Sequence, residues 1–406
     1  MKYTIGEISE IIDGDRGKNY PQQHEFSDNG YCLFLNTGNV TAEGFSFVSN
    51  QYISKEKCDS LRKGKLQRRD IVYTTRGTVG NAAFYSHTVP YEHIRINSGM
   101  VIIRPNEEMV CTEYLYQVLK SAHYRPFFKS FCTGSAQPQL PIKNFSTIEL
   151  NFPELLVQRK IASILCSYDD LIENNQKQIK LLEEAAQRLY KEWFVDLRFP
   201  GYENTPVVDG VPEGWITGKF SDYTDIMSGG TPKTDVAEYY RGSIPFYTPK
   251  DSDGAFFAFD TLTHISESGL QHCNSQFYPV GTVIITARGT VGKTTILAVP
   301  MAMNQSCYAL KSDTLNSPYY LFFSLNLEVE KLKTMANGGV FNTIIVKTFD
   351  QISLTIPQKE VLQAFDQRVT PIMEQIKAKM WQISLLKEAR DRLLPKLMNG
   401  EIEVIP

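Results

Sequence analysis

The pentapeptide Arg76-Gly77-Thr78-Val79-Gly80 returns as Arg288-Gly289-Thr290-Val291-Gly292, an offset of 212 positions from Arg76 to Arg288. An apolar, β-branched run precedes each copy, Ile71–Thr75 in the first and Val283–Thr286 in the second. Such a run closed by glycine predicts a buried strand that enters a tight loop. Because the whole strand-and-loop pattern recurs, we expect the chain to contain one domain twice.

The repeat extends beyond the two loops. Upstream, Leu33–Thr37 aligns with Pro245–Pro249 at the same offset, and each segment predicts a strand that leads into a polar turn. Downstream, Phe145 aligns with Phe349 at an offset of 204, so deletions in the second copy absorb the difference. The pattern predicts an α+β fold built from two tandem α/β domains, each followed by a long helix.

Each of these helices carries a seam of the coiled-coil kind. Residues spaced alternately four and three apart keep one stripe facing a partner helix. The first seam consists of Tyr168, Ile172, Asn175, Ile179, Leu182, Ala186, Leu189 and Trp193, and adding 204 gives Ile372, Ile376, Lys379, Ile383, Leu386, Arg390, Leu393 and Leu397. Arg390 replaces Ala186, and we expect it to snorkel or to meet a carboxylate such as Glu183 if the helices pair. The alternative is that each helix only packs on its own domain.

A linker separates the two copies, because residues 198–214 are rich in proline, glycine and asparagine. We therefore divide the chain into a first domain at 1–155, a helix at 156–199, a linker at 200–214, a second domain at 215–357 and a helix at 358–406.

The bulk composition is that of an ordinary globular protein. A chain of 406 residues with 42% hydrophobic and 21% charged residues suggests two domains, and its apolar runs are too short to span a bilayer. Seven scattered cysteines without a Cys-x-x-Cys pair predict a reduced, cytoplasmic and metal-free protein. Taken alone, the net charge of −3 counts against DNA binding, because typical nucleic-acid binders have a basic surface. One basic cluster stands out, which is either a contact surface or a solvated loop: Arg62, Lys63, Lys65, Arg68 and Arg69.

Two motifs that look catalytic fail on inspection. The segment Ala287–Thr294 resembles a phosphate-binding loop, but alanine replaces the first glycine that such a loop needs. Asn316-Ser317-Pro318-Tyr319 resembles a motif of adenine methyltransferases, but Ser317 and Pro318 also suit a helix start, and no cofactor loop lies nearby. The six histidines show no metal-ligand spacing. We interpret the neighbouring carboxylates Asp169 and Asp170 as acids at a helix start, where the helix dipole favours them. The sequence therefore contains nothing that supports an enzyme.

Several phrases resemble the specificity subunit of type I restriction-modification enzymes. Leu140–Phe145 and Ile148–Pro153 are similar to the end of its recognition domains, and Gln158–Leu165 looks like the opening of its central conserved helix. Leu393–Ile402 resembles its C-terminal signature. The departure is Leu362–Phe365, which replaces the Gln-Arg-Lys-Ile phrase in the second copy.

This resemblance, which covers essentially the whole chain, implies a non-catalytic subunit that reads a split sequence in double-stranded DNA, one half per domain. It implies that the two helices pair as an antiparallel coiled coil, that the copies are related by pseudo-twofold symmetry, and that the helices act as a ruler. A helix from Asp169 to Val195 would be about 40 Å long, close to one turn of B-DNA. The implied partners are two copies of a DNA-adenine methyltransferase subunit and a restriction translocase, which would hold the methyl donor and ATP.

For DNA contacts, polar residues of the repeated loops and of the segments before each conserved phenylalanine are the candidates. They are Arg76, Thr78, Ser135, Gln137 and Gln139 in the first copy, and Arg288, Thr290, Lys293, Asn337, Asn342 and Thr343 in the second. The alternative is that the repeated loops are turns needed for folding. Two other functions stay open: a coiled-coil adaptor that binds no nucleic acid, and the recognition part of a related enzyme that fuses catalysis with recognition.

Overall fold

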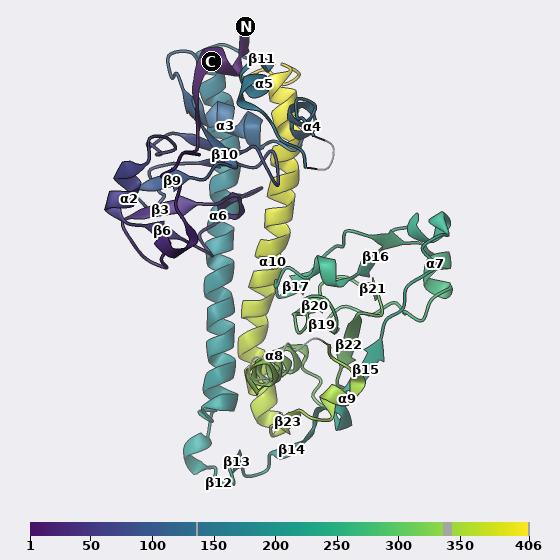
Figure 1. The fold of residues 1–406 in the computed structure, drawn as a ribbon. Coiled ribbons are helices and arrows are strands. Elements are labelled where there is room, and N and C mark those ends of the chain that lie inside the picture. Colours follow the sequence, from purple (N-terminus) through teal and green to yellow (C-terminus); the bar gives the residue numbers. More distant parts are fainter. Residues whose placement is uncertain (135–136, 336–342, 405–406) are drawn as a thin grey trace. The chain divides into compact units, whose positions relative to one another are not determined.

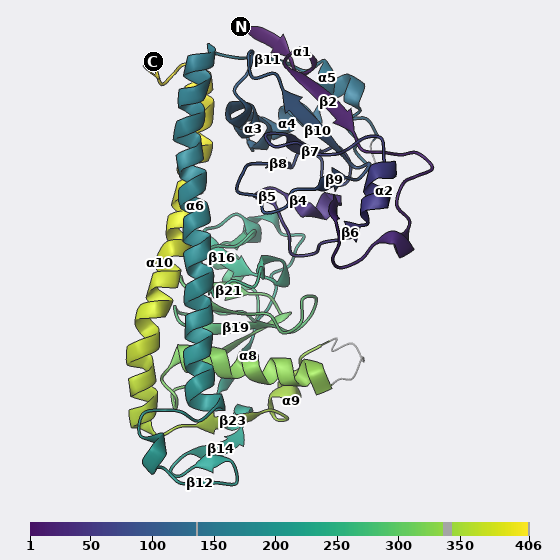
Figure 2. The same cartoon turned by 90° about the vertical axis from the view of Figure 1, so that its left-hand side faces the viewer.

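The computed structural model describes residues 1–134, 137–335 and 343–404. The chain forms two compact units, which Figures 1 and 2 show as ribbons. Unit 1 comprises Met1–Glu173 and Ser384–Pro406, and unit 2 comprises Asn174–Ile383. Each unit therefore holds one globular copy of the repeat together with a part of each long helix.

The strands of unit 1 form one four-stranded sheet and three smaller ones, in the orders β2-β10-β7-β8, β6-β3-β9, β1-β11 and β4-β5. Their bounds are β1 Lys2–Thr4, β2 Ser9–Asp13, β3 Cys32–Leu35, β4 Val40–Thr41, β5 Gly44–Phe45, β6 Tyr52–Ile53, β7 Ile71–Thr74, β8 Ala82–Phe84, β9 Ile94–Ile96, β10 Met100–Pro105 and β11 Glu149–Asn151. The short helices are α1 Ile5–Ile8, α2 Lys55–Ser60, α3 Thr112–Lys120, α4 Arg125–Lys129 and α5 Ile142–Ser146.

Unit 2 repeats this arrangement, with sheets in the orders β15-β22-β19-β20-β17, β18-β16-β21, β14-β23 and β12-β13. Its strands are β12 Val207–Val208, β13 Val211–Pro212, β14 Ile216–Lys219, β15 Asp225–Ser228, β16 Ile244–Tyr247, β17 Phe257–Ala258, β18 His264–Ile265, β19 Val283–Thr286, β20 Thr294–Leu297, β21 Ala302–Met303, β22 Cys307–Lys311 and β23 Ser353–Ile356. Its helices before the last are α7 Glu267–Gln271, α8 Pro318–Met335 and α9 Val346–Phe349. The shared order of elements confirms the predicted internal repeat.

Burial on both faces explains why the repeated strands are continuous apolar runs. In β7, Ile71 and Tyr73 enter one hydrophobic cluster while Val72 enters another. In β19, Val283 and Ile285 likewise enter one hydrophobic cluster while Ile284 enters another. Since successive side chains of a strand point to opposite faces, an alternating polar pattern is absent where both faces are covered.

The two long helices are α6, Leu155–Tyr190, which continues as a π-helical turn over Lys191–Val195, and α10, Lys359–Met398. They run antiparallel within each unit (Figure 2). In unit 1, Leu165 of α6 shares the core with Leu394 of α10. In unit 2, Asn175 bonds to Gln382, and the Trp193 ring lies 6.1 Å from that of Phe365. Residue numbers on α10 thus fall as those on α6 rise, which confirms the antiparallel pair.

One expectation about α6 is wrong. Asp169 does not lie at a helix start, because α6 begins at Leu155 and Asp169 is in its interior. Among the described residues, no helix is long and apolar enough to cross a membrane.

Candidate nucleic-acid interface

The loop Arg76–Gly80 connects β7 with β8, and the hydroxyl of Thr74 closes it. Thr74 Oγ1 donates to the carbonyl of Thr78 at 2.6 Å and accepts from the amide of Asn81 at 2.9 Å. The amide of Gly80 donates to the carbonyl of Thr74 at 3.1 Å. A fully buried hydroxyl therefore fixes the loop at its base.

The loop Arg288–Gly292 of unit 2 has the same three bonds. Thr286 Oγ1 donates to the carbonyl of Thr290 and accepts from the amide of Lys293 at 3.0 Å. The amide of Gly292 donates to the carbonyl of Thr286 at 2.8 Å. The repeat thus extends to individual hydrogen bonds, and Thr74 and Thr286 are structural residues that the sequence analysis did not single out.

The glycines of both loops have a backbone conformation that other residues rarely adopt. Gly77 and Gly80 have φ of 69° and 100°, and Gly289 and Gly292 have φ of 80° and 78°. Glycine takes these angles without strain. The glycines and the buried threonines are therefore needed for the turn itself, which leaves the remaining loop side chains available for contacts.

Those remaining side chains lie at the surface. Thr78, Arg288 and Thr290 are exposed and Arg76 is half-buried, whereas Val79, which follows Thr78, is buried. Within the described parts of the chain, neither arginine side chain makes a hydrogen bond or ion pair. A guanidinium without an internal partner can donate several hydrogen bonds to phosphate or to a base edge.

A second segment lies beside each loop. The amide of Leu140 donates to the carbonyl of Thr75 at 3.0 Å, and the amide of Ile344 donates to the carbonyl of Ala287 at 2.9 Å. The donors Leu140 and Ile344 are related by the downstream offset of 204, and the acceptors Thr75 and Ala287 by the offset of 212 of the repeated loops. The structure therefore places the described part of each predicted segment, next to Leu140 or Ile344, at the base of its loop.

The predicted residues of these segments are only partly described. Gln137 and Gln139 are exposed, and Gln139 is joined to Thr133 by backbone bonds of 2.7 and 2.9 Å. Thr343 is also exposed. Ser135, Asn337 and Asn342 lie outside the described residues.

Lys293 differs from its counterpart in the first loop. Asn81 is buried and donates from Nδ2 to the carbonyl of Val40 at 2.9 Å, whereas Lys293 is exposed. Lys293 lines a groove of about 560 Å³ together with residues such as Phe322 and Asn326 of α8. The position is therefore open to a ligand in unit 2 only.

The polar turn that was predicted after each aligned strand lies next to the repeated loop. Thr290 Oγ1 donates to the carbonyl of Pro249 at 3.2 Å, and Pro249 opens the turn Pro249–Asp251, in which Lys250 is exposed. The corresponding turn of unit 1 is Thr37–Asn39. The alignment of the preceding strands located these turns, but no residue was assigned to them.

The basic cluster is in part structural. Arg68 Nη1 donates to the carbonyls of Ser86 at 2.7 Å and Val89 at 2.9 Å. Arg69 pairs with Glu113 at 2.9 Å and with Glu107. Burial opposes ionisation of Glu113, but Arg69 outweighs it and holds the pKa of Glu113 below its usual value. The exposed members are Arg62, Lys63 and Lys65.

The motif that resembled a methyltransferase site is a helix cap. Ser317 Oγ accepts from the amide of Tyr320 at 3.2 Å, and α8 begins at Pro318. In the described ranges, no group of three histidine, cysteine or acidic side chains is placed to hold a metal ion.

The chain is similar to known proteins along its length. A family model described as the type I restriction modification DNA specificity domain matches residues 1–184 and 212–382. The specificity subunit of the type I restriction enzyme HindI from Haemophilus influenzae is 25% identical to this chain, over 99% of each of the two chains. The MjaIX specificity subunit of Methanocaldococcus jannaschii is 28% identical over 82% of this chain and 78% of its own. A crystal structure of the type I restriction-modification S subunit from M. genitalium has the same fold, with a TM-score of 0.58, 15% identity and coverage of 100% and 96%.

Proposed function

The chain belongs to the type I restriction-modification DNA specificity family, and on that premise we propose that each unit reads one half of a split DNA target. The observation that carries this proposal is the loop that occurs twice with the same hydrogen bonds and with an arginine that has no side-chain partner among the described residues. Repeated scaffolds with different side chains suit a target whose two halves differ in sequence.

We assign the globular regions 1–155 and 215–357 to DNA recognition, and the regions 156–199 and 358–406 to the helices that connect and space them. Residues 200–214 are the linker between the two halves. The length of α6, 36 residues, supports a spacing role, since such a helix spans about 54 Å.

Two kinds of contact follow from the comparison of the loops. Arg76 with Arg288, and Thr78 with Thr290, occupy equivalent positions and would hold each unit on the duplex backbone. Positions that differ would choose bases, and Lys293, where unit 1 has the buried Asn81, is the clearest case in the described loops. Lysine favours guanine in the major groove, whereas Gln137 and Gln139 favour adenine.

Catalysis would belong to other subunits. The relatives are named specificity subunits of type I restriction enzymes, which supports assembly with methyltransferase and restriction subunits. We propose two copies of a DNA-adenine methyltransferase subunit, which would carry the methyl donor, and a restriction translocase that carries ATP. A partner that supplies phosphate contacts would also explain how a chain of net charge −3 works on DNA.

Modified-base sequencing of the host genome, with and without this gene, tests the proposal. We expect one split motif with methyl-adenine in both halves to disappear when the gene is deleted. A methylation pattern that does not change, although the gene and its methyltransferase are expressed, would overturn the role in modification. The coiled-coil adaptor would then be favoured, and it predicts no salt-dependent DNA binding.

A further inference from the structure

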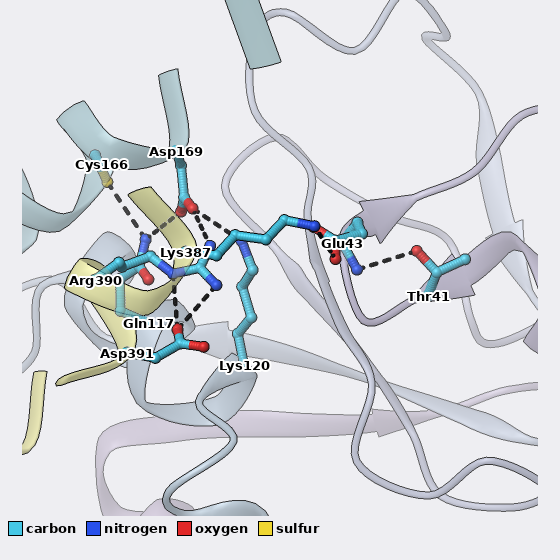
Figure 3. A network of polar contacts seen from close by, with 9 residues as sticks. All are labelled: Thr41, Glu43, Gln117, Lys120, Cys166, Asp169, Lys387, Arg390 and Asp391. Atoms are coloured by element: carbon cyan, nitrogen blue, oxygen red, sulfur yellow. Dashed lines mark hydrogen bonds and ion pairs between the residues drawn. The ribbon is translucent and has the colours of Figure 1, made fainter. Parts of the chain in front are cut away.

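Unit 1 holds α10 through two charge pairs, which Figure 3 shows together. Lys387 Nζ lies 2.9 Å from Glu43 Oε1, and Arg390 Nη1 lies 2.6 Å from Asp169 Oδ1. Lys387 and Arg390 are three residues apart on α10, so both side chains lie on the same face of the helix. One short stretch of α10 therefore meets an acid of the globular copy and an acid of α6.

The acid on α6 is part of a buried network. Asp169 also accepts from Lys120 Nζ at 3.1 Å and from Gln117 Nε2 at 2.6 Å. The side chains of Asp169, Arg390 and Lys120 are 22%, 13% and 9% exposed. Burial opposes ionisation, but Lys120, Gln117 and Arg390 outweigh it and keep the pKa of Asp169 below its usual value. The carboxylate is therefore charged and depends on its cationic partners.

The other long helix carries different residues at the equivalent positions. Counting back 204 residues, Lys387 corresponds to Glu183 and Arg390 to Ala186. The two helices share one apolar seam, so α6 of a second copy has the spacing needed to take the place of α10. In that arrangement Glu183 would face Glu43, and Ala186 would leave Asp169 without its arginine.

In unit 2 the positions equivalent to Arg390 and Asp169 are apolar. Ala186 is fully buried in the same hydrophobic cluster as Met373, which corresponds to Asp169. Glu183 occupies the helix position that Lys387 occupies in unit 1. Burial and the nearby Asp253 raise the pKa of Glu183, so this position is acidic and poorly solvated in unit 2. The two pairings thus differ in charge although they share the seam.

We propose that Lys387 and Arg390, with Glu43 and Asp169, form a pairing code by which the first copy of the repeat accepts α10 and rejects α6 of a second copy. The code matters because α6 is synthesised before α10 and, in a pool of nascent chains, meets identical α6 helices first. A wrong pair would join two first copies. The inference goes beyond DNA reading, because it concerns which two copies of the repeat are combined in one subunit.

Co-expression of two full-length copies with different tags tests the code. One tag is used for purification, and the recovered amount of the other copy is measured. The variant K387E/R390A gives α10 the residues of α6 at both positions, and we expect it to raise recovery of the second copy on the order of tenfold over wild type. The matched control R392A/K396E makes the same change in charge at two exposed positions of α10 and should stay at the wild-type level.

A second variant covers the case in which K387E/R390A does not fold. E43K changes one side chain that is 51% exposed, and it should repel Lys387 and attract Glu183. We expect E43K also to raise recovery of the second copy, whereas E108K, at another exposed acid of unit 1, should not. If E43K and its control recover equal amounts while both keep the wild-type circular dichroism spectrum, the apolar seam alone decides the pairing and the proposal fails.

Discussion

The guanidinium of Arg390 lies 2.6 Å from the carboxylate of Asp169, although the two residues are 221 positions apart in the sequence. Both belong to the long helices, which share the apolar core of unit 1 through residues such as Leu165 and Leu394. A shift of the pair by one heptad would place Asp169 beside Ile383 or Leu397 instead, and would bury a charge without its partner. Such polar residues in a seam fix the register of paired helices at some cost in stability.

Replacing Asp169 with alanine should lower the free energy of unfolding of unit 1 by about 3 kcal/mol, because it removes the carboxylate of the buried Lys120 and leaves Arg390 with the more exposed Asp391 alone. Arg390→Ala should cost less, since Lys120 still pairs with Asp169. Chemical denaturation measures both. Asp170→Ala changes the exposed neighbour and should stay within about 0.5 kcal/mol of wild type; an equal loss in D170A would mean that the network is not the cause.

The same pair predicts a dependence on pH. The folded-state pKa of Asp169 is lowered, so its contribution is fully present above the ordinary aspartate pKa, near 4, and is lost as the pH falls through the folded value. The difference in unfolding free energy between wild type and D169A should therefore shrink at acid pH. Denaturation curves at a series of pH values measure this difference, and a gap that stays constant below pH 4 would exclude the ion pair as its source.

Glu183→Gln should have the opposite sign and stabilise unit 2 at neutral pH by roughly half a kcal/mol. Burial and Asp253 raise the folded-state pKa of Glu183, so its charged form costs stability above that pKa and the cost disappears as the pH falls. Glu184→Gln is the matched control, since its side chain is exposed. Thermal unfolding of both variants at neutral and acid pH decides the matter; a gain in E183Q that persists at acid pH would point to packing instead of charge.

Thr286→Val should destabilise the loop Arg288–Gly292. The hydroxyl of Thr286 both donates to Thr290 and accepts from Lys293, so valine leaves a part-buried carbonyl and a part-buried amide without this partner, at a cost of about 1 kcal/mol. Thr290→Val, at the exposed tip, removes one exposed hydrogen bond to the carbonyl of Pro249 and should lower the melting temperature less than Thr286→Val. The two variants together separate the folding role of the loop from its contact role, and equal melting temperatures would show that the hydroxyl bridge is dispensable.

Sequence patterns predicted the repeat, its two offsets and the paired helices, because these depend on local spacing of apolar residues and glycine. They did not predict the partner of Arg390. Arg390 was expected to snorkel or to meet a carboxylate such as Glu183, and it pairs with Asp169 instead of Glu183. A seven-residue period is satisfied by several registers, and the choice between them depends on contacts with α3, such as Lys120, that no local pattern contains. For the same reason Thr74 and Thr286 were missed, since their bonds to the loop follow from its folded path.

Arg288→Ala should weaken DNA binding without unfolding unit 2, because its side chain is exposed and the bonds that fix the loop come from Thr286 and the glycines. If Arg288 contacts a phosphate, its loss should weaken binding equally on all sequences and reduce the slope of the logarithm of the binding constant against the logarithm of the salt concentration by about one. If Arg288 contacts a base, its loss should cost about 1–3 kcal/mol and relax the specificity at one position of the target. Binding of the assembled complex to target and non-target DNA over a salt series distinguishes these results. Lys311→Ala serves as the control, because it removes the same charge. Lys311 is exposed at the end of β22 and pairs with Asp313. If R288A lowers the melting temperature of unit 2 and leaves the affinity of the folded fraction unchanged, Arg288 belongs to the scaffold and the loop is a turn needed for folding.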